Sequence, residues 1–286
     1  MTLPSYLTEN AIRDLCQRAI TEDVGSGDAT TLAIVPSEQK VTASFVPRKA
    51  CIVAGMPILK ILFAELSADV DFKVLVEDGQ SAEPGQTIAV ASGNARAILT
   101  GERTALNLLQ RLSGIATMTH RYVEALGDSK TVLLDTRKTT PGLRLFEKYA
   151  VLMGGASNHR IGLYDRIMLK DNHLALARLT GPDAISRAVR QCRQKYPSLE
   201  IEVEADTLED VRLAAEAGVE YILLDNMSNE EMVEAVKIIN GRARTEASGN
   251  ITLERLPSLR DLGLDYVSSG ALTHSATAVD IGLDIR

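Results

Sequence analysis

The sequence contains no tryptophan, and aromatic side chains make up only 4% of its 286 residues. Proteins that bind single-stranded nucleic acid commonly stack the bases on aromatic side chains. A basic excess is also missing, because the formal net charge is −7, whereas proteins that bind duplexes or anionic membranes normally present a basic face. We therefore expect no nucleic-acid partner and no membrane partner.

Cysteine is scarce, and long apolar runs are missing. The three cysteines, Cys16, Cys51 and Cys192, are far apart and show neither CxxC nor Cys-His spacing. This pattern argues against a disulfide framework and against a zinc site. No run approaches the roughly 18 apolar residues of a transmembrane helix, and the N-terminus lacks the apolar stretch of a signal peptide. These absences predict a cytoplasmic protein.

From residue 130 onward the chain repeats one pattern, in which a short apolar run ends in polar residues and is followed by an amphipathic segment. Alternating units of this kind indicate a parallel sheet, and their number favours a βα barrel. Strands are expected at 131–138, 166–172, 199–206, 220–226, 243–250 and 265–271. Helices are expected at 143–155, 183–196, 207–218, 228–239 and 252–263.

The first part of the chain has a different pattern, with strand-like segments at 40–55 and 71–93 and a helical segment at 95–114. We predict an α/β protein with an N-terminal α/β sandwich domain, residues 1–112, and a βα barrel, residues 113–275. The C-terminal tail, 276–286, is expected to pack with the first domain. The segment EDVGSGDATT, 22–31, is interpreted as a loop capped by Asp28 or Thr30.

Barrel enzymes place their chemistry at the carboxyl ends of the strands. The segment from 135 to 173 has nine cationic groups against four acids, which indicates a focused anion site in an acidic chain. Arginine can donate two parallel hydrogen bonds to a carboxylate or phosphate. Arg137 and Arg160 are therefore candidate anion-binding residues, together with Lys138 and Lys170. Solvated helix faces and surface ion pairs are the alternative, and they are favoured for Arg144, Lys148 and Arg166.

Carboxylates at later strand ends need a counter-charge, because a carboxylate that is partly removed from water is costly. Mg²⁺ shared with ligand phosphates and hydroxyls would supply one for Glu204 and Asp225. An ion pair with Lys170 is the alternative. The glycines in EASGN and SSGA, near residues 249 and 270, can bring backbone N–H groups close to a phosphate.

Five ordered blocks resemble the signature motifs of the quinolinate phosphoribosyltransferase family. They are DTRKTTPGLRLFEKYAV, GGASNHRIGLYDRIMLKDNH, ILLDNMS, EASGNITLE and SSGALTHSATAVDIGLDI, and the likeness continues into the N-terminal part. The resemblance implies transfer of phosphoribosyl from phosphoribosyl pyrophosphate to quinolinate, with Mg²⁺ and loss of carbon dioxide, in NAD biosynthesis. It also implies an incomplete TIM-like barrel with an N-terminal sandwich, and a homodimer or a hexamer.

Matched by position, the resemblance implies that Arg103 reaches the substrate from a neighbouring subunit. Lys138, Glu204 and Asp225 are the implied catalytic residues, with Glu204 and Asp225 near the ribose and the metal. The other implied substrate-binding residues are Thr136, Arg137, His159, Arg160, Lys170, Ser248, Gly249, Asn250, Ser269, Gly270 and Ala271.

Three positions depart from the family pattern: Ala156 and Asn250 stand where glycine is usual, and Ser269 where valine is usual. None removes a charged group. The open alternatives are a transferase of the same fold that uses nicotinate or the acceptor of the molybdenum-transport paralogue, and a binding protein that has lost turnover. Retention of Arg103, Arg137, Glu204 and Asp225 favours the enzyme.

Overall fold

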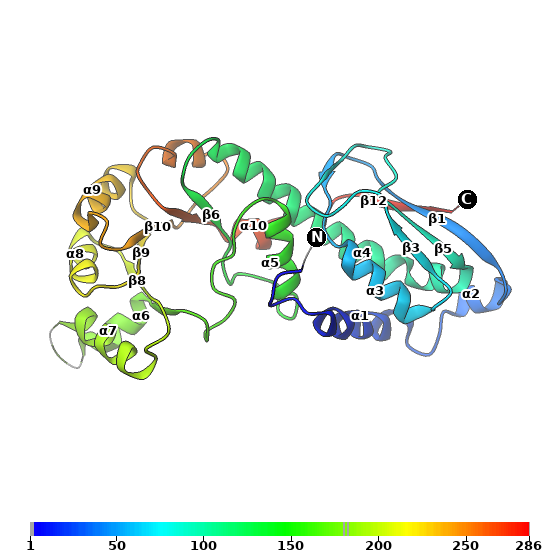
Figure 1. Cartoon of the computed structure of the whole chain (residues 1–286), viewed down its shortest axis with the longest axis horizontal. Coiled ribbons are helices and arrows are strands. Elements are labelled where there is room, and N and C mark those ends of the chain that lie inside the picture. Colours follow the sequence, from blue (N-terminus) through cyan, green and yellow to red (C-terminus); the bar gives the residue numbers. More distant parts are fainter. Residues whose placement is uncertain (1–2, 180, 182, 286) are drawn as a thin grey trace. The chain divides into compact units, whose positions relative to one another are not determined.

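The computed structural model describes residues 3–179, 181 and 183–285, which divide into two compact units (Figure 1). The first unit lies within Met1–His120, Thr140–Gly155 and Ser275–Arg286, and the second comprises Arg121–Thr139 and Ala156–His274.

An antiparallel sheet in the order β12-β1-β5-β3 organises the first unit. Strand β12 pairs with β1, so two segments that are far apart in the sequence share one sheet. A two-stranded sheet of β2 and β4 lies in the same unit. The strands are β1 (Lys40–Pro47), β2 (Cys51–Ile52), β3 (Asp71–Val74), β4 (Ser81–Ala82), β5 (Ala89–Asn94) and β12 (Ile281–Ile285).

The core of the first unit contains three phenylalanines whose ring centroids lie within 6.1 Å of one another. Phe45 comes from β1, Phe63 from α3 and Phe72 from β3, so this cluster joins a helix to the sheet. The edge-to-face and stacked pairs add to the burial of apolar area. The helices associated with this unit are α1 (Glu9–Val24), α2 (Ala29–Ile34), α3 (Met56–Leu66), α5 (Arg144–Met153) and most of α4 (Ala95–Leu126).

Two features of these helices bear on the sequence interpretation. Asp28 is the N-cap of α2, and its carboxylate accepts a hydrogen bond from the Thr31 amide at 3.0 Å. Of the two caps considered, Asp28 is therefore the one used. Although α4 has 32 residues, no helix in the described part of the chain combines the length and the hydropathy needed to cross a membrane.

The compact units divide the chain differently from the boundary we placed at residue 112. Residues 113–120 continue α4, and the helix α5 packs with the first unit although it follows the first barrel strand in sequence. Two polar contacts hold α5 there: the Tyr149 hydroxyl donates to Asp78 at 2.6 Å, and Arg111 forms an ion pair with Glu147 at 2.8 Å. Periodicity identified the helix, but it carried no information about these partners.

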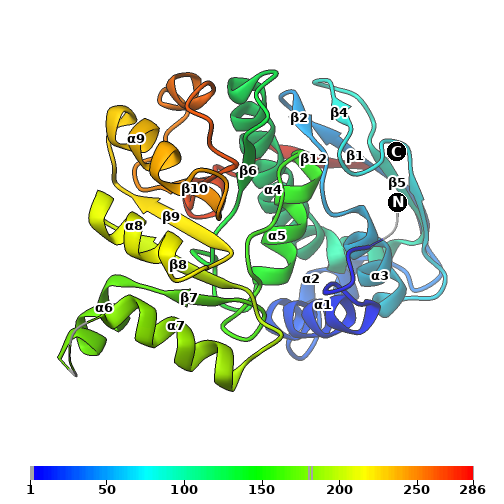
Figure 2. The ribbon, with the colours of Figure 1, turned by 60° about the vertical axis from the view of Figure 1, so that its left-hand side comes forward.

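Six parallel strands in the order β6-β11-β10-β9-β8-β7 form the second unit (Figure 2). The edge strands β6 and β7 do not pair; an isolated parallel bridge joins Leu134 to Ser157 instead. The βα barrel expected from the alternating pattern is therefore confirmed, and it is incomplete, as the family resemblance implied. The strands are β6 (Val132–Leu134), β7 (Ile167–Leu169), β8 (Ile201–Ala205), β9 (Tyr221–Asp225), β10 (Arg244–Ser248) and β11 (Tyr266–Ser268).

The helices α7, α8 and α9 lie along the outer face of this curved sheet (Figure 2). Side chains cap the last two of these helices: Thr207 accepts from the Asp210 amide at the start of α8, and Ser228 begins α9 with a capping box to Glu231. The helices of the second unit are α6 (Asp171–Arg178), α7 (Ala184–Lys195), α8 (Leu208–Glu216), α9 (Asn229–Ile239) and α10 (Ala271–His274).

Two helix assignments need correction. The expected helix at 252–263 is wrong, because only a 3₁₀ turn, Leu256–Leu259, forms around Pro257; proline lacks the N–H that an α-helix requires and clashes with the preceding turn. Conversely, α6 follows β7 directly and was not expected. Its polar start, Asp171 and Asn172, was interpreted as the end of the strand.

Truncating Phe45 to Ala should destabilise the first unit by about 3–5 kcal/mol, because this fully buried ring contacts both other rings of the cluster. Urea denaturation followed by circular dichroism measures this change in the free energy of unfolding. Leu75→Ala is the matched control, since that side chain is 47% exposed. A loss below about 1 kcal/mol for Phe45→Ala would contradict the assigned core.

Candidate active site

A cavity of about 480 Å³ lies at the carboxyl ends of the parallel strands in the second unit. All six strands point the same way, so their ends converge on this one edge. Most of the predicted residues line it: Thr136, Arg137, Lys138, His159, Arg160, Lys170, Glu204, Asp225, Ser248, Gly249 and Asn250.

The basic side of the cavity begins with the segment that follows β6. Lys138 is held by its backbone: its amide donates to Thr136 Oγ1 at 3.0 Å, and its carbonyl accepts from Thr273 Oγ1 at 2.8 Å. Gly270 packs against the same side chain, because a Cβ atom there would lie 2.7 Å from Lys138 Cδ. A glycine at 270 therefore makes room for the lysine.

Arg160 is the most buried cation of the cavity, with 7% of the residue exposed. Its guanidinium donates to the Arg166 carbonyl at 3.0 Å and contacts Met168 Sδ at 3.7 Å. Burial and the nearby charge of Arg137 lower the pKa of Arg160. An anion bound next to Arg160 would offset this penalty, because an opposite charge favours the charged form of the guanidinium.

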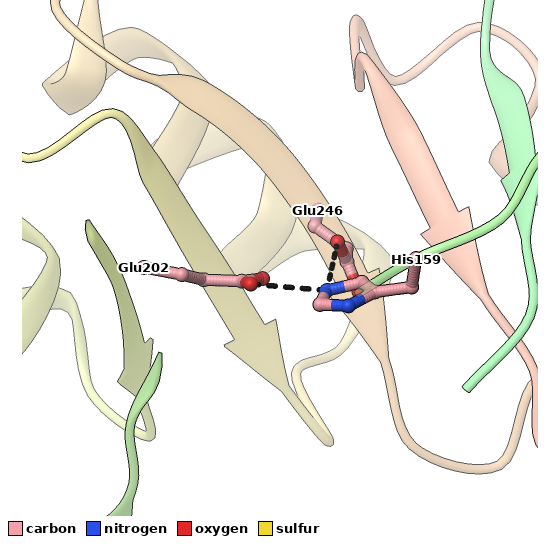
Figure 3. A group of neighbouring side chains, drawn as sticks. All are labelled: His159, Glu202 and Glu246. Carbon is pink, nitrogen blue, oxygen red and sulfur yellow. Dashed lines mark ion pairs between the residues drawn. The ribbon is translucent and has the colours of Figure 1, made fainter. Parts of the chain in front are cut away.

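His159 lies against two buried carboxylates (Figure 3). Its Nε2 is 3.0 Å from Glu202 Oε2 and 3.4 Å from Glu246 Oε2, and both glutamates are at most 1% exposed. Burial favours the neutral imidazole, but the hydrogen bonds and charges of the two glutamates outweigh it and raise the pKa of His159 to about 9. Burial and the charge of Glu246 also raise the pKa of Glu202.

The other side of the His159 ring shows where its proton lies. Nδ1 accepts a hydrogen bond from the Arg160 backbone N–H at 2.7 Å. An imidazolium carries a proton on both nitrogens and cannot accept there. In this contact the ring is therefore neutral with its proton on Nε2, although the two glutamates raise the pKa of the imidazole and so favour its protonation.

The acidic side of the cavity is formed by the ends of β8 and β9. Glu204 forms an ion pair with Lys170 at 2.7 Å, as the alternative to a metal anticipated. Carboxylate oxygens of Glu204, Asp206 and Asp225 nevertheless lie within 4.8 Å of one another. Partial desolvation and the charge of Asp225 raise the pKa of Asp206. Three hard oxygen donors with mutual repulsion fit a divalent cation such as Mg²⁺.

Between the two sides lies a loop after β10 in which consecutive residues have left-handed backbone conformations. Gly249 has φ +87°, and a Cβ there would lie 2.1 Å from Asn226 Oδ1. Asn250 has φ +52°. Asparagine tolerates this region better than most residues, which explains how it can stand where the family usually has glycine. Arg255 ties the loop down by donating to the carbonyls of Gly249 and Met227.

Four predicted residues do not line this cavity. Ser269 is buried and donates to the Ile251 carbonyl at 2.9 Å, Gly270 supports Lys138, and Ala271 begins α10. Arg103 is an exposed residue of α4 in the first unit. Ser268, the first residue of SSGA, lines the cavity instead.

One acidic residue, Glu202 in the middle of β8, escaped the sequence interpretation. Asp206, just beyond the end of β8, was expected at the mouth of the barrel but not among the ligand-binding residues. A signal was present, because the segment LEIEVEAD places glutamates at alternate positions, and alternate residues of a strand share one face. In a barrel that face is the interior. The cavity also includes Met168, Leu223, Asn226 and Glu246.

A parallel βα barrel with a charged cavity at the carboxyl ends of its strands is the arrangement of a barrel enzyme that acts on small, highly charged substrates. The described geometry agrees with two family models. Residues 28–113 match the N-terminal domain of quinolinate phosphoribosyl transferase, and residues 115–284 match its C-terminal domain. The chain belongs to the quinolinate phosphoribosyltransferase family, as the motifs indicated.

Similar proteins come from several bacteria. The chain is 43% identical over 275 residues to a probable carboxylating nicotinate-nucleotide pyrophosphorylase of Bacillus subtilis, covering 96% of this chain and 93% of that protein. A crystal structure of NadC from Streptococcus pyogenes has a TM-score of 0.92 at 44% identity, covering 98% of this chain and 99% of that one. A nicotinate-nucleotide pyrophosphorylase from Francisella tularensis also has a TM-score of 0.92, at 34% identity, with full coverage of both chains.

Replacing Asp135 by Asn should destabilise the barrel by about 1–3 kcal/mol. The fully buried carboxylate accepts from the His159 amide and from Asn158 Nδ2, both at 2.8 Å, and an amide presents a donor to one of them. Thermal denaturation and urea titration measure the loss. Asp261→Asn, at an exposed position, should leave stability within about 0.5 kcal/mol; equal behaviour of the two variants would contradict this role of Asp135.

Proposed function

We propose that the protein transfers the phosphoribosyl group of phosphoribosyl pyrophosphate to quinolinate and releases pyrophosphate and carbon dioxide, giving nicotinate mononucleotide for NAD biosynthesis. The observation that carries the proposal is the polarity of one cavity: Arg137, Lys138 and Arg160 on one side face Glu204 and Asp225 on the other. The names of the similar proteins agree with it.

The basic side suits the acceptor. Quinolinate carries two adjacent carboxylates, and planar guanidinium groups can hold them in fixed positions. Two fixed guanidinium groups would also orient the acceptor, so that its ring nitrogen points at C1 of the ribose. Nicotinate has one carboxylate and would leave part of this basic set without a partner. The number of cations therefore favours the dicarboxylate.

The acidic side suits the donor. As pyrophosphate departs, positive charge develops on the ribose ring, and the carboxylates of Glu204 and Asp225 can stabilise it electrostatically while binding the hydroxyls. Lys138 is placed to interact with the negative charge that develops on the leaving group. The loop of Ser248, Gly249 and Asn250 offers backbone N–H groups to the 5′-phosphate.

The decarboxylation needs no further catalytic group. Once the ring nitrogen is bonded to ribose, the pyridinium accepts the electron pair left by the departing carboxylate, and solvent supplies the proton that replaces carbon dioxide. The chain contributes by holding the ring in place and by keeping the positive charge of the pyridinium close to the carboxylate that leaves.

We also propose Mg²⁺ as the cofactor. Glu204 and Asp225 would hold it, with Asp206 as a third oxygen donor. Bound there, the ion would neutralise phosphate charge on the donor substrate. The cytoplasm is the proposed compartment, because three free cysteines fit a reducing environment; relatives in Nicotiana and Arabidopsis are named mitochondrial and chloroplastic.

Incubation with phosphoribosyl pyrophosphate and Mg²⁺ should give nicotinate mononucleotide and carbon dioxide in equal amounts from quinolinate and no product from nicotinate. Chromatography and ¹⁴C release measure both products together. Chelation of the metal should abolish turnover, and Arg137→Ala should lower kcat/KM by about 100-fold or more with an unchanged fold. Product from nicotinate alone would leave the fold but refute the acceptor.

We further propose a homodimer in which Arg103 enters the cavity of the other subunit. Neither Arg103→Ala nor Arg137→Ala homodimers should then be active. Co-expression of the two variants with different tags should restore about a quarter of the wild-type activity, because half of the dimers are mixed and each contains one intact site.

The matched control is co-expression of Arg137→Ala with Lys138→Ala. These two residues belong to the same barrel, so a mixed dimer has no intact site and should stay inactive. Absence of restoration in the first pair, or equal restoration in both, would refute the sharing of Arg103.

A further inference from the structure

Glu202 is the acidic residue of the barrel interior that the proposed mechanism does not use. It is fully buried in the middle of β8 and does not line the cavity. A buried carboxylate without a partner is costly, so its surroundings identify what it does. Its Oε2 lies 3.0 Å from Nε2 of His159 (Figure 3). The same oxygen lies 3.7 Å from a guanidinium nitrogen of Arg166.

Glu246 approaches the same imidazole nitrogen from β10, at 3.4 Å. The two glutamates come from strands separated by β9, and the loop that carries His159 brings the ring between them (Figure 3). Rigid strands therefore fix two carboxylates within ion-pair distance of Nε2, although neither completes a hydrogen bond of standard geometry with it. Such a pair holds the imidazole plane and selects the tautomer with its proton on Nε2.

The tautomer matters on the opposite side of the ring. With its proton on Nε2, His159 presents a free lone pair on Nδ1 to the backbone N–H of Arg160 at 2.7 Å. Asp135 fixes the preceding peptide by accepting the His159 amide at 2.8 Å. The backbone that carries Arg160 is thus held through the histidine ring, while the guanidinium is held by Arg166 and Met168.

The same three side chains have ligand atoms close enough for a metal ion. The charges favour a different use. A metal ion would need the lone pair of Nε2, the nitrogen to which we assign the ring proton, and Arg166 already places a positive charge 3.7 Å from Glu202. We therefore argue for a role without a metal.

We propose that Glu202 and Glu246 are positioning residues, which set the orientation of His159 and, through its Nδ1, the placement of Arg160 for the acceptor carboxylate. The inference rests on the proposed role of His159 and Arg160 in binding quinolinate. It predicts that a residue outside the cavity controls the affinity for one substrate and not for the other.

Glu202→Gln tests this, because Glu202 does not line the cavity and can influence substrate only through its neighbours. We expect the KM for quinolinate to rise about tenfold, as for other residues that orient a ligand-binding histidine, while the KM for phosphoribosyl pyrophosphate changes less than twofold. In a His159→Asn background the same substitution should add less than twofold, since coupled residues are not additive.

Glu200→Gln is the matched control. Glu200 lies 3.7 Å from Arg166, like Glu202, but it is exposed and no contact joins it to His159 in the described chain. It should leave both KM values unchanged. If Glu202→Gln fails to fold, Glu202→Asp keeps the charge but withdraws the carboxylate by one methylene, and it should raise the KM for quinolinate in the same way.

A second readout does not depend on activity. The sequence has four histidines, so ¹⁵N NMR with ring-labelled histidine can follow His159, assigned by its loss in His159→Asn. The wild type should show a protonated Nε2 and an unprotonated Nδ1, and Glu202→Gln should disturb that pattern. An unchanged pattern, or an unchanged KM for quinolinate in an active variant, overturns the inference. An inactive wild type with the expected ring pattern refutes the proposed function instead.

Discussion

Two carboxylates inside a barrel, those of Glu202 and Glu246, can remain there only because cationic and proton-bearing groups reach them. Losing one partner of such a buried set leaves an uncompensated charge, which is costly. His159, from the loop before β7, and Arg166 are the partners. Arg160 is connected to the same acidic residues through the ring of His159.

The order of the strands separates the two sides of the cavity. Along the sheet, the cationic segment after β6 lies next to β11, the glycine loop follows β10, and the acids follow β9 and β8. The glycine loop therefore lies between the cationic segment and the acidic strand ends. Neighbouring strand ends are about 5 Å apart, so this sequence of groups fits into one cavity.

Much of this could be predicted from sequence. The alternation of apolar runs and amphipathic segments defined the barrel, and the residues at strand ends, such as Arg137, Lys138, Glu204 and Asp225, line the cavity. For these residues the position at a strand end was enough to predict the site, because a barrel brings the ends of its strands together whatever their side chains are. The long motifs indicated the family, and the family is confirmed.

What escaped prediction depended on contacts between distant residues. Glu202, Glu246 and His159 come from two strands and a loop. A local sequence pattern does not indicate which buried carboxylate lies next to which basic side chain. The packing of α5 with the first unit depended likewise on Asp78 and Arg111. The 3₁₀ turn at Leu256–Leu259 is a different case, since Pro257 was visible in the sequence and should have ended the helix.

The pairing of β12 with β1 has a consequence for biosynthesis. During translation β1 emerges before the second unit is made, yet its edge partner, residues 281–285, follows all six strands of that unit in the sequence. While the second unit is being synthesised, the nascent chain thus exposes an unpaired strand edge, a site at which chains can associate wrongly. The sheet of the first unit is completed only after the second unit has been made, so its protection in that interval falls to chaperones or to the speed of elongation.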